Sequence, residues 1–176
     1  MYEIIQKTLP MQSMMINYEV MIDNEKMNKK IIDQIDKSGD RQKRESNVKA
    51  DMTDWDMRKK PGFKELIKIT DKVVVDVQKK HFNVNTKLIL DDVWGTKYKS
   101  NEETIEHDHY PAAWSFVYYP NATKGAPGLT FREANVERTI VKGLLMFFLG
   151  NVRHSVQKKE YEGYRYCVAG NYKDLK

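Results

Sequence analysis

The first part of the chain alternates between strand-like and helix-like spacing of its hydrophobic residues. Met11–Ile22 is rich in Met, Ile, Val and Tyr, which predicts one or two strands. Asn24 is a residue type that caps helices, and apolar side chains then recur at helical spacing as far as Gly39. These side chains are Met27, Ile31, Ile32 and Ile35. We therefore expect an amphipathic helix here, followed by a polar, basic loop over Asp40–Ser46.

A second helix is predicted from near Gly62 to about Phe82, and His81 at its end is interpreted as a cation favoured by the helix dipole. Its wide apolar face consists of Phe63, Leu66, Ile67, Ile69, Val73, Val74 and Val77. Beyond it, short apolar runs are separated by turn residues over Asn121–Pro127 and Glu160–Gly163. The predicted strands are Lys87–Tyr98, Trp114–Tyr119, Gly128–Arg132, Gly143–Leu149 and Tyr164–Tyr172. This series predicts a β-sandwich or barrel with the helices packed on its outside.

Composition narrows the class of protein. The 176 residues suit one domain, with 40% hydrophobic and 31% charged residues, as in soluble globular proteins. No apolar run approaches the roughly 18 residues of a membrane-spanning helix, and the first residues lack the pattern of a secretory signal. The single Cys167 excludes an internal disulfide. Together these features predict a cytoplasmic protein without a membrane partner. The net charge is +5, but lysines are spread among acidic residues, which argues against nucleic acid as a partner.

Three of the four histidines form the pattern His107-Asp-His109, followed by His154. Alternate residues of a strand point to the same side, so His107 and His109 are expected to reach one metal ion while Asp108 points away. His154 follows the apolar strand Gly143–Leu149 and would close the site from across a barrel. Imidazole is a ligand for iron, zinc, copper and nickel. The pattern therefore indicates a metal site of unspecified kind, although three unrelated histidines would give the same spacing.

Arg165 opens the last predicted strand, one face of which shows Arg165, Cys167 and Ala169. An arginine followed by small side chains leaves space inside a barrel. A buried guanidinium requires an anion, and its planar fork matches a carboxylate. The alternative interpretation is an arginine that makes a surface salt bridge at the start of a strand.

From Asp91 to Asn171, about half of its length, the chain resembles the Fe(II)/2-oxoglutarate-dependent oxygenases. It is most similar to their prolyl-4-hydroxylase-like branch, which has phage and bacterial members. The resemblance rests on the order of Tyr98, the His-x-His pair, segments 114–121 and 127–131, the strand before Arg153-His154, and Arg165–Asn171. It implies a mixed α+β, mainly β fold, with a double-stranded β-helix (jelly-roll) core and N-terminal supporting helices. Residues 1–176 would form a single oxygenase domain, with supporting elements in 1–85 and the metal-binding β core in 86–172.

The resemblance also implies a hydroxylase that uses Fe(II), 2-oxoglutarate and O2, with ascorbate as a candidate reductant. His107 and His154 would be metal ligands. Arg165 and Tyr119 would bind the distal carboxylate of 2-oxoglutarate, and Tyr98 would line the cofactor or substrate pocket. The substrate would be a peptidyl proline, another amino-acid side chain or a small molecule, selected by loops 46–56 and 101–106. A virus-encoded protein acting in the host cytoplasm is a further implication of the phage members.

The chain departs from the family pattern at His109, where the family usually has a carboxylate ligand. Three explanations are open: His109 replaces the carboxylate as ligand, water takes the ligand position while His109 lies behind it without contacting the metal, or a bulge turns Asp108 inward as the ligand. Strand alternation favours His109, which gives the ligand set His107, His109 and His154.

Three other functions fit part of the pattern. A three-histidine zinc enzyme would use the same ligands but would leave Arg165 without a role. A cupin-type dioxygenase usually has a glutamate where Ala113 and Trp114 stand. A non-catalytic β-helix module, such as a virion-associated protein with a decayed metal site, is the remaining alternative.

Overall fold

A computed structural model describes residues 2–8, 16–38, 46–84 and 86–175. Within these ranges the chain forms two α-helices and two sheets, of seven and five strands, whose strand pairs are antiparallel. The large sheet consists, in spatial order, of β1 (Tyr2–Thr8), β2 (Ile16–Ile22), β10 (Leu144–Leu149), β7 (Trp114–Tyr118), β12 (Arg165–Asp174), β5 (Leu88–Tyr98) and β4 (Asp51–Met52). The small sheet consists of β3 (Val48–Lys49), β6 (Glu103–His107), β11 (His154–Val156), β8 (Leu129–Phe131) and β9 (Val136–Arg138).

Both predicted helices are present. Asn24 caps α1 (Glu25–Lys37) by accepting a hydrogen bond from the Met27 amide at 3.0 Å. The second helix, α2 (Phe63–Val77), continues into a π-helical turn (Gln78–Phe82), so helical backbone ends where the apolar pattern ended. The expected end of the first helix at Gly39, the loop 40–45 and residues 11–15 lie outside the described residues.

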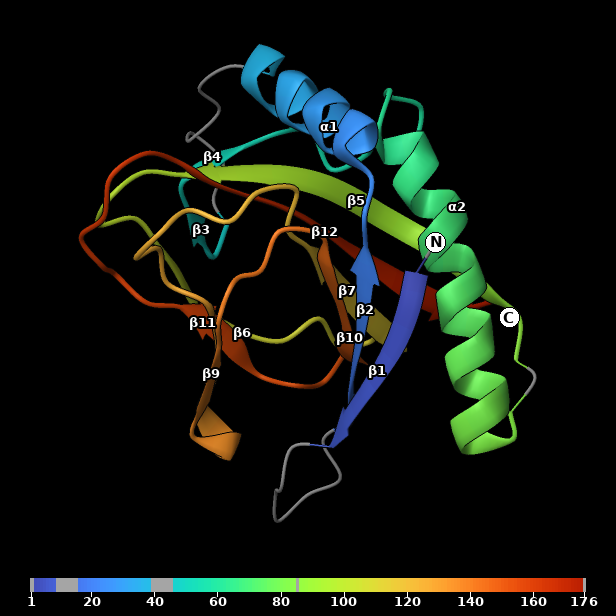
Figure 1. The fold of residues 1–176 in the computed structure, drawn as a ribbon. Helices are drawn as coiled ribbons and strands as arrows, with labels where there is room; N and C mark the ends of the chain where they lie inside the picture. Colours follow the sequence, from blue (N-terminus) through green and yellow to red (C-terminus); the bar gives the residue numbers. More distant parts are fainter. Residues whose placement is uncertain (1, 9–15, 39–45, 85, 176) are drawn as a thin grey trace.

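The large sheet lies between the two helices and the small sheet (Figure 1). One apolar cluster joins the helices to one face of the large sheet through side chains such as Phe63, Val168 and Tyr172. A second cluster joins the opposite face to the small sheet through side chains such as Phe148 and Phe131. Each fully buried side chain of this size contributes about 1.5–3 kcal/mol, so these two clusters hold the three layers together.

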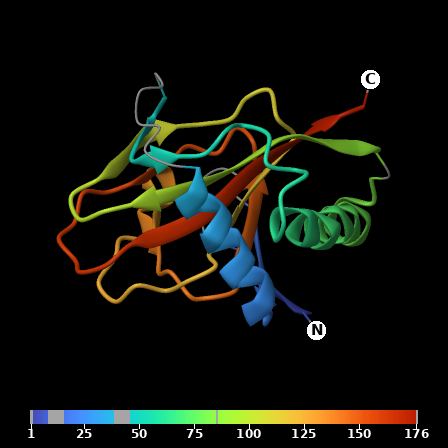
Figure 2. The ribbon, with the colours of Figure 1, turned by 90° about the horizontal axis from the view of Figure 1, so that it is seen from above.

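The two longest strands, β5 and β12, lie side by side across the molecule (Figure 2). Their register pairs Arg165 with Tyr98 near one end and Asp174 with Leu88 at the other. Since alternate residues share a face, β12 turns Tyr166 and Val168 toward the helices and Arg165 and Cys167 toward the small sheet. This ladder positions much of the candidate site.

The five strands predicted in the second part of the chain are confirmed within one or two residues at most ends. Five strands were not predicted: β1, β3, β4, β9 and β11. The last four contain only two or three residues, too few to show a hydrophobic period, and β1 precedes the predicted segment. The strand expected through His107–His109 ends at His107. Among the described residues, neither helix combines the length and apolar character needed to cross a bilayer.

Candidate metal centre

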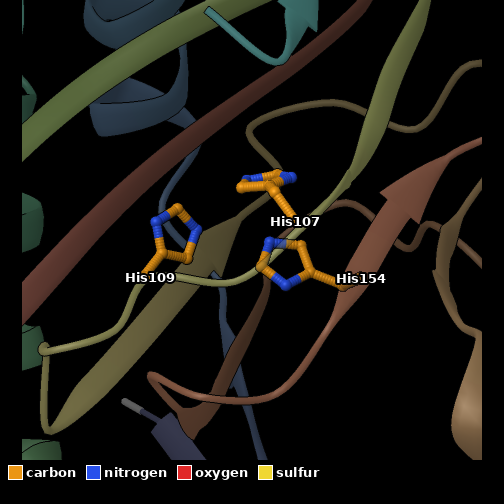
Figure 3. Close-up of side chains that lie close together, drawn as sticks. All are labelled: His107, His109 and His154. Atoms are coloured by element: carbon orange, nitrogen blue, oxygen red, sulfur yellow. The ribbon is translucent and has the colours of Figure 1, made fainter.

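The structure brings the three predicted histidines together between the two sheets (Figure 3). Their potential ligand atoms all lie within 4.8 Å of one another. His107 ends β6 and His154 begins β11, and the two residues are directly paired in the small sheet. The expectation that His154 closes the site from across a barrel is therefore wrong, because it lies beside His107 in the same sheet.

Two of the histidines are oriented by backbone carbonyl groups. Nδ1 of His107 lies 2.8 Å from the Ile105 carbonyl oxygen, and Nδ1 of His154 lies 2.9 Å from the Val152 carbonyl oxygen. A carbonyl only accepts, so each Nδ1 carries the proton and donates it. In both rings Nε2 is then unprotonated, which is the form that binds a metal ion.

His109 reaches the cluster from a loop instead of from a strand. Its amide donates to the Gly150 carbonyl at 2.7 Å, and its carbonyl accepts from the Ala112 amide at 2.8 Å. Gly150 approaches this loop so closely that a Cβ at this position would lie 2.0 Å from the Ala112 carbonyl oxygen. His109 lies near His107, but not because alternate residues of one strand point to the same side, since the strand ends before His109.

Asp108 lies outside the cluster of ligand atoms. Its side chain is exposed, and its Oδ1 accepts a hydrogen bond from the Tyr110 amide at 3.0 Å. Among the described His, Cys, Asp and Glu side chains, the group with close potential ligand atoms at this place consists of the three histidines and includes no carboxylate. The geometry therefore favours His109 over Asp108 as the third potential ligand.

Burial keeps the three rings neutral. It lowers the pKa of His107, lowers that of His109 to about 4 with a further contribution from His107, and lowers that of His154 well below its ordinary value. A neutral imidazole binds a metal ion without a net loss of protons from the ring, provided that its one proton is on the other nitrogen.

We expect the metal-free protein to lose stability as the pH falls from 7 to 5. The unfolded chain takes up protons on its histidines near pH 6.5 while the folded histidines stay neutral, so protons favour unfolding in this range. The wild type should lose up to about 1.4 kcal/mol per pH unit more than His154→Leu, which lacks one such group. Urea unfolding in the presence of a chelator measures the difference. The raised pKa of Asp92, about 6 through burial, acts in the opposite direction but is common to both proteins. Parallel pH profiles would contradict the prediction.

A cavity between the sheets holds the predicted cofactor-binding arginine together with the histidines. Its lining includes Arg165, Tyr98 and Cys167 from the large sheet and His107 and His154 from the small sheet. Arg165 is 1% exposed. Its Nε donates to the Pro127 carbonyl at 3.0 Å, and none of the described ion pairs joins it to a carboxylate. The surface salt bridge considered from sequence is therefore excluded for the described residues.

Aromatic rings surround this guanidinium. Its central carbon lies 4.5 Å from the ring centre of Tyr98 and 5.3 Å from that of Tyr119, and its Nη2 donates to the Tyr119 hydroxyl at 3.5 Å. Burial raises the pKa of both tyrosines, so both hydroxyl groups stay protonated at neutral pH. Tyr98 lines the cavity, whereas Tyr119 is wholly buried and does not belong to its lining. Cys167 is buried on the cavity side, as predicted.

A second, wider cavity opens on the other side of the histidines. Both cavities share His107, His109, Trp94 and Val48 in their walls, so the histidines separate an inner space from an outer one. The outer wall adds residues of three kinds: aromatic Trp55 and Tyr110, charged Asp91, Asp92, Asp108 and Lys173, and small or amide residues Ser46, Asn47, Ala112 and Asn171, besides Pro111. Loop 46–56 contributes as expected, but residues 101–106 do not line this cavity, and 108–112 take their place.

Asn171 and Asp92 are site residues that sequence reasoning missed. The signal was available, because Asn171 falls on the same face of its strand as Arg165, three alternations further on. Only the sheet pairing, in which Asn171 lies opposite Asp92, shows that this face continues to His109.

The comparisons with known proteins agree with this arrangement. No protein-family model and no curated protein matches the sequence. Among solved structures, a viral collagen prolyl hydroxylase from Paramecium bursaria Chlorella virus-1, solved as a 2-oxoglutarate complex, superposes with a TM-score of 0.70 at 15% identity, over 89% of this chain and 94% of that chain. A Pseudomonas putida prolyl-4-hydroxylase gives 0.66 at 14% identity, over 99% and 93%.

A third similar structure is a Trichoplax adhaerens prolyl hydroxylase in complex with a hypoxia-inducible-factor peptide fragment. Its TM-score is 0.63 at 16% identity, over 89% of this chain and 83% of that chain. At these identities the likeness is one of backbone. The chain therefore has the fold of the prolyl hydroxylases, mainly β with two covering helices, and the resemblance noted from sequence is confirmed at the level of the fold.

Proposed function

We propose that the protein is a non-haem Fe(II)/2-oxoglutarate-dependent dioxygenase that hydroxylates a peptide or amino-acid side chain. The observation that carries this proposal is the buried Arg165, which lines the same cavity as three clustered histidines and has no carboxylate partner among the described residues. A buried, unpaired guanidinium is costly, and an anionic ligand in the cavity would offset that cost.

His107, His109 and His154 would hold the iron. The donor set fits, because three neutral imidazoles on one side of an ion suit iron and leave other coordination positions open. Arg165 would pair with the distal carboxylate of 2-oxoglutarate, and Tyr98 and Tyr119 would fix the guanidinium between them. When bound, iron, 2-oxoglutarate and O2 supply the oxidising chemistry, with ascorbate as a candidate reductant. The protein residues bind, orient and exclude water.

The substrate would enter through the outer cavity. Its rim carries two exposed aromatic side chains, Trp55 at 41% and Tyr110 at 80% exposure, which offer flat surfaces for a proline ring or a peptide. The Trichoplax hydroxylase was solved with a peptide fragment, which makes a peptidyl proline the first substrate to try. The two sheets would form the double-stranded β-helix core of one oxygenase domain over residues 1–176, with the two helices as supporting elements. The protein would act in the cytoplasm, either of its own cell or of a host.

Anaerobic titration with Fe(II) and then 2-oxoglutarate tests this function directly. We expect a visible metal-to-ligand charge-transfer band that needs both ligands, and succinate formation once O2 is admitted. A zinc enzyme, which the three neutral histidines also fit, would bind metal without any effect of 2-oxoglutarate. If neither the band nor succinate appeared although metal bound at the histidines, the oxygenase proposal would be abandoned. A protein that bound neither ligand would be a non-catalytic module.

A further inference from the structure

The paired strands β5 and β12 contribute one continuous face to the walls of both cavities. Arg165, Cys167 and Ala169 line the inner cavity, and Asn171 lines the outer one. Each lies opposite a residue of β5 that lines the same cavity; the pairs are Arg165–Tyr98, Cys167–Thr96, Ala169–Trp94 and Asn171–Asp92. The pair of strands that begins at Arg165 and Tyr98 therefore brings the Asn171 amide, from β12, next to His109 and pairs it with the Asp92 carboxylate, from β5.

Asn171 is held on two sides. Its side chain is buried, its amide oxygen accepts from the Ser115 hydroxyl at 2.8 Å, and its amide nitrogen donates to Asp92 Oδ1 at 2.8 Å. The same amide nitrogen lies 3.5 Å from Nδ1 of His109. Since Nδ1 faces Asn171, Nε2 is the nitrogen that faces the other two rings (Figure 3).

His109 thus differs from the other two histidines in what supports it. His107 and His154 each donate Nδ1–H to a backbone carbonyl, which leaves Nε2 unprotonated. His109 instead faces an N–H group, and a nitrogen that faces a donor must itself be an acceptor. The neutral His109 ring then carries its proton on Nε2, where it blocks coordination.

We infer that Asn171 is the positioning residue of His109: its amide, held between Ser115 and Asp92, sets which ring nitrogen carries the proton and so whether Nε2 is free for metal. This inference rests on the proposed function, in which His109 is a ligand. A half-turn of the amide would present its oxygen to His109 and stabilise Nδ1–H. The Ser115 hydroxyl can serve both orientations, because it can donate or accept. Asp92 favours the orientation seen here, because a carboxylate accepts from the amide nitrogen.

The exchange of the two side chains tests this arrangement. The double variant Asp92→Asn/Asn171→Asp has the same net charge as the wild type. Its carboxylate at position 171 faces His109 and accepts Nδ1–H without any rotation of the side chain. The new amide at position 92 can still donate to it, as can Ser115. A carboxylate behind a ligating histidine also raises its basicity, so we expect the exchanged protein to bind Co(II), a spectroscopic substitute for Fe(II), about 10-fold more tightly than the wild type. Asn171→Leu cannot offer an oxygen to Nδ1–H, as the wild-type amide does after a half-turn, so this variant should bind Co(II) about 10- to 100-fold more weakly than the wild type.

Nitrogen-15 NMR of the histidine rings in the metal-free protein gives a second readout that needs no metal. We expect an Nε2–H ring at His109 in the wild type and an Nδ1–H ring there in the exchanged protein, with His107 and His154 as Nδ1–H rings in both. Asn28→Leu is the matched control, since Asn28 is also buried and bonds Tyr118, away from both cavities.

The outcomes separate this inference from the proposed function. An unchanged His109 tautomer in the exchanged protein, which circular dichroism must show to be folded, would overturn the role of Asn171. If the tautomer changed as expected but no variant formed the charge-transfer band with Fe(II) and 2-oxoglutarate, the inference would hold and the oxygenase proposal would fail. Equal loss of Co(II) binding in Asn171→Leu and Asn28→Leu would reduce Asn171 to a structural role and overturn the inference.

Discussion

Replacing Arg165 with methionine is expected to weaken 2-oxoglutarate binding at least about 30-fold and, at the same time, to stabilise the ligand-free protein. The guanidinium is 1% exposed, and its hydrogen bonds go to a carbonyl, a thiol and a phenol, not to a carboxylate. Removing one partner of a buried, charged pair costs about 2–5 kcal/mol of binding, so affinity should fall at least about 30-fold. The same change removes a buried charge that no carboxylate among the described residues neutralises, which should add about 1–4 kcal/mol to the free energy of unfolding.

Two further variants show whether this combination of weaker 2-oxoglutarate binding and higher stability is specific to the loss of the Arg165 guanidinium. Arg138 makes an ion pair with the buried Glu19, so Arg138→Met leaves a carboxylate without that partner and should destabilise the protein by about 1–3 kcal/mol. Arg165→Lys keeps the charge but loses the planar fork, and should bind 2-oxoglutarate weakly. Urea unfolding and thermal shifts with and without 2-oxoglutarate measure both effects. A destabilised Arg165→Met that still bound 2-oxoglutarate normally would show that Arg165 is structural.

Such opposed effects on stability and binding are expected where a fold carries a site. Two other side chains of β12 form their hydrogen bonds within the protein: the Tyr166 hydroxyl bonds Asp36, and the Tyr172 hydroxyl bonds Thr70 and Asp71. Arg165, in contrast, is a buried charged side chain of that strand for which the described residues supply no carboxylate. The buried histidines also cost stability, although less than the buried arginine, because burial lowers their pKa values and removes the hydration that an exposed ring would keep.

Local patterns in the sequence predicted the elements well where the elements are long. The caps and periodicity around Asn24 and Gly62 predicted both helices, and apolar runs predicted the strands that carry Tyr98 and Arg165. Alternation from Arg165 correctly placed Cys167 and Ala169 on the cavity side. These inferences work because propensity and period are properties of neighbouring residues.

What the sequence did not show was the pairing of short or distant segments. β11 has three residues, so nothing local indicates that His154 lies opposite His107. β2 pairs with β10, near the other end of the chain, and this pairing makes the first strands part of the large sheet. The support of His109 by Asn171 likewise needs the register of β5 and β12, which long-range packing determines.

Replacing His107 or His154 with alanine is expected to reduce metal binding about 100-fold or more. Loss of a partner behind a ligand already costs about 10- to 100-fold in metal affinity, and loss of a ligand should cost at least as much. The fourth histidine, His81, belongs to the π-helical turn that follows α2 and provides the matched control, because His81→Ala also removes one imidazole from the chain. Competition with a chromophoric chelator under anaerobic conditions measures the dissociation constant for Fe(II).

The decisive comparison within this series is His109→Ala against Asp108→Asn. His109 shares the cluster with the other two rings, whereas Asp108 is exposed and engaged by the Tyr110 amide. We therefore expect His109→Ala to weaken metal binding nearly as much as His107→Ala, and Asp108→Asn to leave it within about threefold of the wild type, since it changes only a nearby, screened charge. The reverse result would make Asp108 the third ligand, which requires the loop held by Gly150 to rearrange when metal binds. If neither variant weakened binding, water would complete a two-histidine site, and His109 would serve the substrate side of the centre.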